Sequence, residues 1–193
     1  MRTVTQWDTQ REIIVLVPLR GLREAKQRLR EALVPDVDDL VRRLARGVIT
    51  AAAPRRCVVV TEDPETADFA HDLGAQVLIS PVASLNGAVQ WAYAELERLA
   101  EHVVIAHGDL LEPSGVHEMG RFHGVTLVAD HHGEGTTVLA LPTGTAFRFA
   151  YGARSLRRHR DEARRLGLPC RVILGSTLSR DVDVAADLDP DGT

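Results

Sequence analysis

The chain has 193 residues, of which 45% are hydrophobic and 26% are charged, a balance typical of a globular protein. Its formal net charge of −4 argues against the basic surface that nucleic-acid binding requires. No apolar run is as long as a membrane span, and the first twelve residues lack a signal-peptide core. We therefore expect one cytoplasmic domain over residues 1–193, with no membrane or nucleic-acid partner and with residues 1–12 as a flexible lead.

The first half of the chain alternates apolar strands with amphipathic helices. Strands are predicted at residues 13–17, 58–61, 77–79 and from residue 103, and helices at 36–53, 64–73 and 85–100. Nearly continuous apolar strands that alternate with helices are typical of a parallel sheet covered on both faces. The pattern predicts the α/β class.

The second half changes character. Strands are predicted at residues 125–129, 136–141 and 170–174, with a basic helix from Ser155 to about Leu166. The Gly- and Asp-rich loop at residues 130–135 is typical of a hairpin connection, although its backbone amides could also hold an anion. The chain has two cysteines, Cys57 and Cys170, in strand-like apolar runs without metal-type spacing, which predicts buried, reduced thiols.

The fourth strand ends at Gly108 and Asp109. In open α/β sheets, ligands bind in the crevice beyond the carboxyl ends of the strands, and Asp109 falls there. The same position would suit a helix cap, because residues 110–113 lead into a plausible helix. Position alone does not separate these two interpretations.

Asp181 and Asp183 form a second acidic pair. They alternate on a strand-like segment, so both side chains would point to one face and repel each other unless a cation lies between them. Together with Asp109 they would supply three oxygen ligands, a set suited to Mg²⁺, although an exposed edge would also tolerate the pair. Histidines at 107, 131 and 132 suggest a softer site, but they lack the helical spacing of a zinc motif.

The segment after the first strand is basic. Arg20, Arg23, Lys26 and Arg28 lie where nucleotide-binding α/β domains usually hold phosphates, and Lys26 is the only lysine of the chain. A solvated helix face would explain the same charges.

Several short segments occur in the order found in a known enzyme family. They are Val17-Pro18-Leu19-Arg20, residues 25–29, residues 59–63, Leu85-Asn86, Gly108-Asp109-Leu110, Asp130 with residues 133–136, residues 151–155 with His159, and residues 181–183 with Asp187-Leu188. Over residues 13–188 the chain resembles the 2-phospho-L-lactate or phosphoenolpyruvate guanylyltransferase family, whose members act in the biosynthesis of the deazaflavin coenzyme F-420.

The resemblance implies a fold and a set of site residues. The fold is a GT-A-like nucleotidyltransferase fold with a mostly parallel mixed sheet flanked by helices. The implied catalytic and metal-binding carboxylates, for Mg²⁺ or Mn²⁺, are Asp109, Asp181 and Asp183. The residues implied to hold the phospho-acid are Thr136, Thr137, Gly152 and Ser155. Those implied to hold GTP are Arg20, Lys26, Arg28 and Asn86.

The resemblance also implies a reaction, the transfer of GMP from GTP to the phosphate of a three-carbon phospho-acid. Phosphoenolpyruvate, 2-phospho-L-lactate and 3-phosphoglycerate are the candidate acceptors. The chain departs from the family pattern at Arg20, Ser84, Leu111, Thr137 and residues 184–185, which bears on the acceptor and the rate. Two alternatives are an enzyme of the same fold with another acceptor, such as a sugar phosphate, and a nucleotide-binding regulator without catalysis. The oligomeric state is left open, and a homodimer is one possible assembly.

Overall fold

The structure is a computed structural model that describes residues 12–22, 26–182, 184 and 187. Of the predicted lead, only Glu12 falls within this range, and its carbonyl oxygen accepts hydrogen bonds from the backbone of Glu101 and His102. The strands are β1 (Ile13–Pro18), β2 (Arg56–Thr61), β3 (Gln76–Ile79), β4 (His102–Ala106), β5 (Val125–Ala129), β6 (Thr136–Pro142) and β7 (Cys170–Ile173). The helices are α1 (Gln27–Glu31), α2 (Val37–Ala51), α3 (Pro64–Asp72), α4 (Leu85–Leu96), α5 (Ser155–Arg165) and the 3-10 turns η1 (Val116–Arg121) and η2 (Thr177–Ser179).

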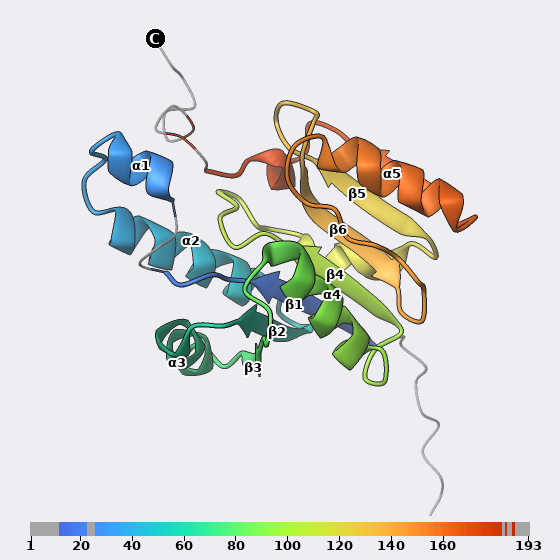
Figure 1. The fold of residues 1–193 in the computed structure, drawn as a ribbon, viewed down its shortest axis with the longest axis horizontal. Coiled ribbons are helices and arrows are strands. Elements are labelled where there is room, and N and C mark those ends of the chain that lie inside the picture. Colours follow the sequence, from blue (N-terminus) through green and yellow to red (C-terminus); the bar gives the residue numbers. More distant parts are fainter. Residues whose placement is uncertain (1–11, 23–25, 183, 185–186, 188–193) are drawn as a thin grey trace, which may run out of the picture.

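The seven described strands form one mixed sheet in the order β3-β2-β1-β4-β6-β5-β7 (Figure 1). The pairs β1–β2, β1–β4, β2–β3 and β5–β7 are parallel, whereas β6 runs antiparallel to both of its neighbours. The predicted α/β class with a mostly parallel mixed sheet flanked by helices is therefore confirmed.

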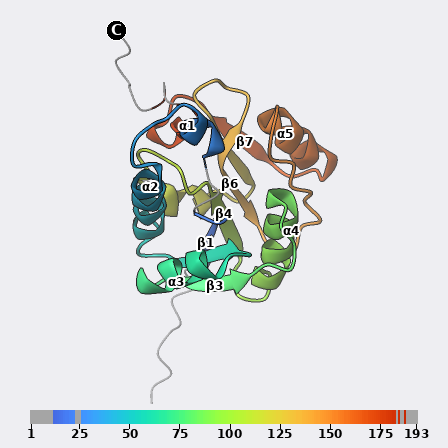
Figure 2. The same ribbon diagram turned by 60° about the vertical axis from the view of Figure 1, so that its left-hand side comes forward.

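Helices cover both faces of the sheet (Figure 2), with α2 on one side and α4 and α5 on the other. The side chains of β1 alternate between these two layers because successive residues of a strand point to opposite faces. Ile13, Val15 and Val17 pack in the core that contains α2, and Ile14 and Leu16 pack in the core that contains α4. This double burial explains why β1 reads as a continuous apolar run.

The segment after β4 differs from the helix that the sequence suggested. The next helical element is η1, which begins after Gly115, a glycine with a φ of 85°. Asp109 is therefore not the cap of a helix. The loop at residues 130–135 is a hairpin connection, as the sequence favoured, because β5 and β6 pair antiparallel on either side of it.

The prediction that both cysteines are buried was wrong for Cys170. Its side chain is exposed because β7 is an edge strand of the sheet, whereas Cys57 on β2 is half-buried. Burial raises the pKa of the Cys57 thiol to about 12, so this thiol stays protonated.

Among the described helices, none combines the length and the apolar character needed to cross a bilayer.

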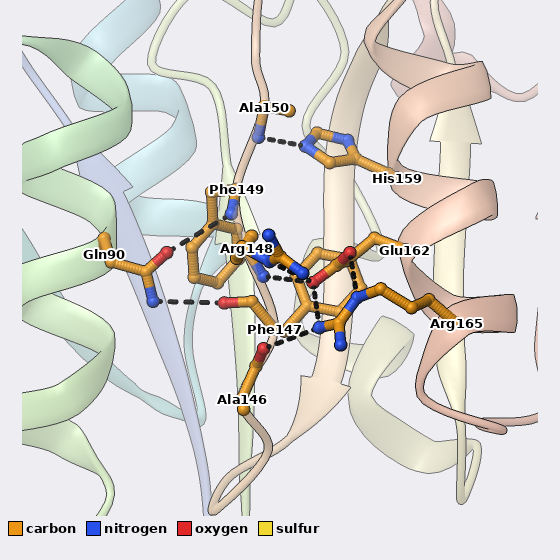
Figure 3. Close-up of polar contacts among 9 residues, drawn as sticks. All are labelled: Gln90, Ala146, Phe147, Arg148, Phe149, Ala150, His159, Glu162 and Arg165. Carbon is orange, nitrogen blue, oxygen red and sulfur yellow. Dashed lines mark hydrogen bonds and ion pairs between the residues drawn. The ribbon is translucent and has the colours of Figure 1, made fainter.

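Residues 146–151, which we call the strap, run between α4 and α5 without belonging to a strand (Figure 3). Two side chains one helical turn apart on α4 bind its backbone. The Gln90 amide bonds Phe147 O and Phe149 N at 3.1 and 3.3 Å, and the Asn86 amide bonds Tyr151 O and Tyr151 N at 3.2 and 2.6 Å. These side-chain amides replace the backbone partners that a neighbouring strand would supply.

Glu162 of α5 holds the other side of the strap. Its carboxylate accepts hydrogen bonds from the Arg165 guanidinium at 2.6 Å and from the backbone N–H of Arg148 at 3.0 Å. The Arg165 hydrogen bond, together with the Arg148 N–H and the two positive charges, lowers the pKa of Glu162 from 4.5 to about 2. The charged form is therefore the one that the folded strap stabilises.

This shift predicts a pH dependence of stability. Since the folded pKa lies below the unfolded one, the contribution of Glu162 is complete above about pH 4.5 and is lost as the pH falls through about 2. We expect Glu162→Gln to be less stable than the wild type at neutral pH and the gap to narrow between pH 5 and 2, measured by urea unfolding. Glu95→Gln, on the exposed side of α4, is the control and should follow the wild type. A gap that stays constant with pH would contradict the assignment.

Candidate active site

A cleft of about 800 Å³ opens at the carboxyl ends of β1 and β4. These strands are adjacent and parallel, so the segments that follow them emerge at the same edge of the sheet. Leu19 and Arg20 come from the first strand, and His107, Gly108 and Asp109 from the second. The far wall is formed by residues of α1 and α2.

Gly108 allows the two segments to approach each other. A Cβ atom at this position would meet Leu19 Cδ2 at 2.2 Å, and Leu19 is itself buried. The glycine before Asp109 thus has a packing reason, because it lets the segment after β4 approach the segment after β1.

Asp181 reaches Asp109 through backbone pairing. Leu111 N–H donates to Arg180 O at 2.9 Å, and Val182 N–H donates to Asp109 O at 3.2 Å, so residues 180–182 lie antiparallel to residues 109–111. The η2 turn just before this segment is held by the Thr137 hydroxyl, which donates to Leu178 O at 2.7 Å.

His107, Asp109 and Asp181 together form a candidate metal site, with one ligand atom from each within 4.8 Å of the others. His107 Nε2 and Asp109 Oδ1 are buried and have no hydrogen-bond partner among the described residues. Buried polar atoms are normally paired, so these two are suited to a bound cation. The two carboxylates supply the oxygen ligands that Mg²⁺ or Mn²⁺ takes, whereas the imidazole is a nitrogen ligand more typical of softer divalent cations. Asp183, the third predicted ligand, lies outside the described residues.

The predicted nucleotide-binding residues are spread around the cleft. Lys26 forms an ion pair with Asp109 Oδ2, and both side chains are mostly buried. Arg20 lines the cleft and donates to Ala83 O at 3.4 Å. Arg28 lies in α1, and its side chain is outside the described part of the structure. Asn86 uses its amide on the Tyr151 backbone, which makes it a support for the strap in this structure.

The predicted phospho-acid residues are also brought together, except for Thr137. Ser155 Oγ donates to Thr136 Oγ1 at 3.4 Å, and the backbone N–H of Ser155 donates to Gly152 O at 3.0 Å. Both hydroxyls are buried beneath the exposed turn at residues 152–154. Thr137 is the next residue of β6, points to the other face and bonds Leu178 O.

The rings of Tyr151 and His159 connect the candidate metal site to the residues predicted to hold the phospho-acid. The Tyr151 ring lies 5.1 Å from the His107 ring and 4.8 Å from the His159 ring, and its buried hydroxyl has no partner among the described residues. Burial raises the pKa of Tyr151 far above its ordinary value, so the phenol stays protonated. The backbone N–H of His107 also donates to Thr137 O at 3.0 Å, which joins the end of β4 to the start of β6.

Sequence reasoning assigned no role in its site to His107, Tyr151 or His159. His107 was weighed as part of a softer metal site, and its position two residues before Asp109 was the available signal. Tyr151 and His159 stood within the resembling segments, but only the fold shows that their rings lie together.

Solved structures of low sequence identity share the fold. A nucleotidyl transferase from Methanothermobacter thermautotroptrophicus aligns with a TM-score of 0.62 at 14% identity, covering 92% of this chain and 94% of that one. A crystal structure from Desulfovibrio desulfuricans that carries the name of a nucleotide-diphospho-sugar transferase aligns with a TM-score of 0.72 at 14% identity, covering 92% and 85%. These matches support the nucleotidyltransferase fold.

The family model described as "Guanylyl transferase CofC like" matches residues 13–190. A phosphoenolpyruvate guanylyltransferase from Sphaerobacter thermophilus is 34% identical over 187 residues, covering 91% of this chain and 90% of the relative. Another from Roseiflexus castenholzii is 30% identical over 182 residues, covering 92% and 86%. The chain therefore belongs to the family of CofC-like guanylyl transferases.

Proposed function

We propose that this protein transfers GMP from GTP to the phosphate of phosphoenolpyruvate and releases pyrophosphate, in a step toward coenzyme F-420. The observation that carries the proposal is the link between two groups of residues, Thr136, Gly152 and Ser155 on one side and His107, Asp109 and Asp181 on the other. The backbone N–H of His107 bonds Thr137 O, and the Tyr151 ring contacts the His107 ring. The names of the relatives support phosphoenolpyruvate as the acceptor. 2-Phospho-L-lactate and 3-phosphoglycerate are chemically close and belong to the panel of acceptors tested below.

The reaction depends on the positioning of the two substrates more than on proton transfer. An oxygen of the acceptor's phosphate, already anionic at neutral pH, forms a bond to the α-phosphorus of GTP, and the bond from that phosphorus to the α–β bridging oxygen breaks. Pyrophosphate leaves with the bonding electrons, so no general base is needed. This agrees with a site built from carboxylates, hydroxyls and backbone amides.

Each group of residues then has a task. His107, Asp109 and Asp181, with Asp183 from the segment outside the described range, would hold a divalent cation, which would neutralise charge on the phosphates. Arg20 and Lys26 would bind the triphosphate in the cleft, and Arg28 is proposed for the same role from its sequence position. Thr136, Ser155 and the turn at Gly152 would hold the acceptor through hydroxyl and N–H donors.

The proposal is tested by assaying the purified protein with GTP and a panel of acceptors, with Mg²⁺, with Mn²⁺ and with EDTA. We expect pyrophosphate release with phosphoenolpyruvate and a divalent cation, a guanylylated product by mass spectrometry, and no turnover with EDTA. Turnover only with a sugar phosphate would favour another acceptor. GTP binding without turnover on any acceptor would make the chain a nucleotide-binding regulator.

Asp109→Asn should separate catalysis from folding. Loss of one carboxylate from the metal group should lower kcat by about 100-fold or more. The melting temperature should change little, because asparagine keeps the size of the side chain, its amide oxygen can still accept from Lys26, and the repulsion from Asp181 is relieved. Asp72→Asn, an exposed residue at the end of α3, is the matched control and should keep the wild-type rate. A near-normal rate in Asp109→Asn would remove Asp109 from the site.

Lys26→Ala tests the phosphate contact. Loss of one charge-assisted hydrogen bond should cost about 1.5–3 kcal/mol, seen as a higher KM for GTP or a lower kcat. Lys26→Arg should recover part of the loss, because the charge is kept while the geometry changes. Arg43→Ala, which removes an exposed cation of α2, controls for net charge. If the GTP dependence of Lys26→Ala is unchanged, Lys26 serves only as the ionic partner of Asp109.

A further inference from the structure

His159 is fully buried and joins three segments of the acceptor side of the site. It projects from α5 toward the strap (Figure 3), where its Nε2 accepts a hydrogen bond from the backbone N–H of Ala150 at 2.9 Å. Its Nδ1 lies 3.1 Å from Thr136 Oγ1, at the start of β6. The ring packs between Phe147 and Tyr151, with centroids at 6.0 and 4.8 Å.

The two contacts determine the tautomer of the ring. A backbone N–H can only donate, so Nε2 must be the unprotonated nitrogen, and a neutral imidazole then carries its hydrogen on Nδ1. Burial, followed by the positive charge of Arg158 and the proximity of His107, lowers the pKa of His159 to about 3, whereas Glu162 acts in the opposite direction. The ring is therefore neutral at physiological pH and donates from Nδ1 to Thr136.

The hydrogen bond donated by His159 limits how the Thr136 hydroxyl can bind a further partner. Thr136 Oγ1 accepts from His159, and Ser155 Oγ–H is directed to the same oxygen at 3.4 Å. A hydroxyl oxygen has two lone pairs and one hydrogen. With both lone pairs engaged, the Thr136 hydroxyl can bind a further partner only as a donor, through its own hydrogen.

We propose that His159 is a positioning residue for the phospho-acid acceptor. Through Nδ1 it orients the Thr136 hydroxyl so that its O–H is available to an oxygen of the acceptor, and through Nε2 it holds the strap that leads into Gly152. The inference rests on the proposed function, because it assumes that Thr136 and Ser155 serve the acceptor. His159 acts through these residues and touches no reacting atom.

Two substitutions separate the two contacts. The amide of His159→Asn occupies the position of Nδ1 and can still donate to Thr136, but it loses Ala150. The amide of His159→Gln reaches the position of Nε2 and can still accept from Ala150, but it loses Thr136. His71→Gln, at the last turn of α3, is the control for the loss of an imidazole elsewhere.

The kinetic test compares KM for phosphoenolpyruvate, KM for GTP, kcat and melting temperature in these variants. We expect His159→Gln to raise KM for phosphoenolpyruvate about tenfold, the value of one neutral hydrogen bond, with KM for GTP within twofold. His159→Asn should stay within about threefold of the wild type for both substrates. In a Thr136→Val background, His159→Gln should add no further effect on the acceptor, because the oriented hydroxyl is already gone.

Two results would overturn the proposal and leave His159 a packing residue. One is a loss of activity that parallels the drop in melting temperature to the same degree in both variants. The other is an equal rise in KM for phosphoenolpyruvate and for GTP. If neither variant folds, nitrogen-15 spectra of the wild type test the proposal. Nitrogen-15 spectra should show a neutral ring protonated at Nδ1, with a resonance that shifts when phosphoenolpyruvate is added. An Nε2-protonated ring, or no shift at saturating phosphoenolpyruvate, would also overturn it. Failure of the wild type to use any acceptor would refute the proposed function instead.

Discussion

The pairing of residues 180–182 with residues 109–111 is the interaction on which the candidate site depends. Two backbone hydrogen bonds, Leu111 N–H to Arg180 O and Val182 N–H to Asp109 O, bring together segments about seventy residues apart in the chain. Because the main chain makes these bonds, the Asp109 and Asp181 carboxylates are placed by backbone geometry rather than by flexible side chains. Two like charges are costly at short range. Lys26 offsets part of that cost through its ion pair with Asp109.

The reversed direction of β6 gives the site its second half. In a parallel sheet only the carboxyl ends of strands reach the ligand edge, but β6 runs antiparallel to β4 and presents its first residues there. Thr136 and Thr137 therefore lie beside the end of β4, where His107 N–H bonds Thr137 O. The alternation of the strand then divides their tasks, since Thr136 faces His159 and Thr137 faces η2.

The strap connects these parts mechanically. Its backbone is bound by Gln90 from α4 and by His159 and Glu162 from α5 (Figure 3). Asn86 of α4 also binds it, so a segment outside any strand is held on two sides. It ends at Tyr151, whose ring lies between His107 and His159. Polar side chains of helices thereby position the turn at Gly152, which follows the Tyr151 ring packed against His107.

Much of the fold could be predicted from the sequence. A strand such as β1 must be apolar throughout because both of its faces are buried, and this pattern is visible without any structure. The helix expected at residues 85–100 ends earlier, at Leu96, and none forms directly after Asp109, because helix ends depend on packing and caps that periodicity does not report. The exposure of Cys170 depended on the place of β7 at the edge of the sheet, and strand order is not encoded in any local pattern.

By itself the sequence determined the fold class, the strand end that bears Asp109, and the residue types suited to a cation and to phosphates. These follow from local hydrophobic periodicity and from the chemistry of single side chains. Only the tertiary structure decided which of those residues meet. It brought Asp181 to His107 and Asp109, His159 to Thr136, and Asn86 to the Tyr151 backbone. Each of these contacts joins segments that lie far apart in the sequence, because contact between elements depends on topology rather than on neighbouring residues in the chain.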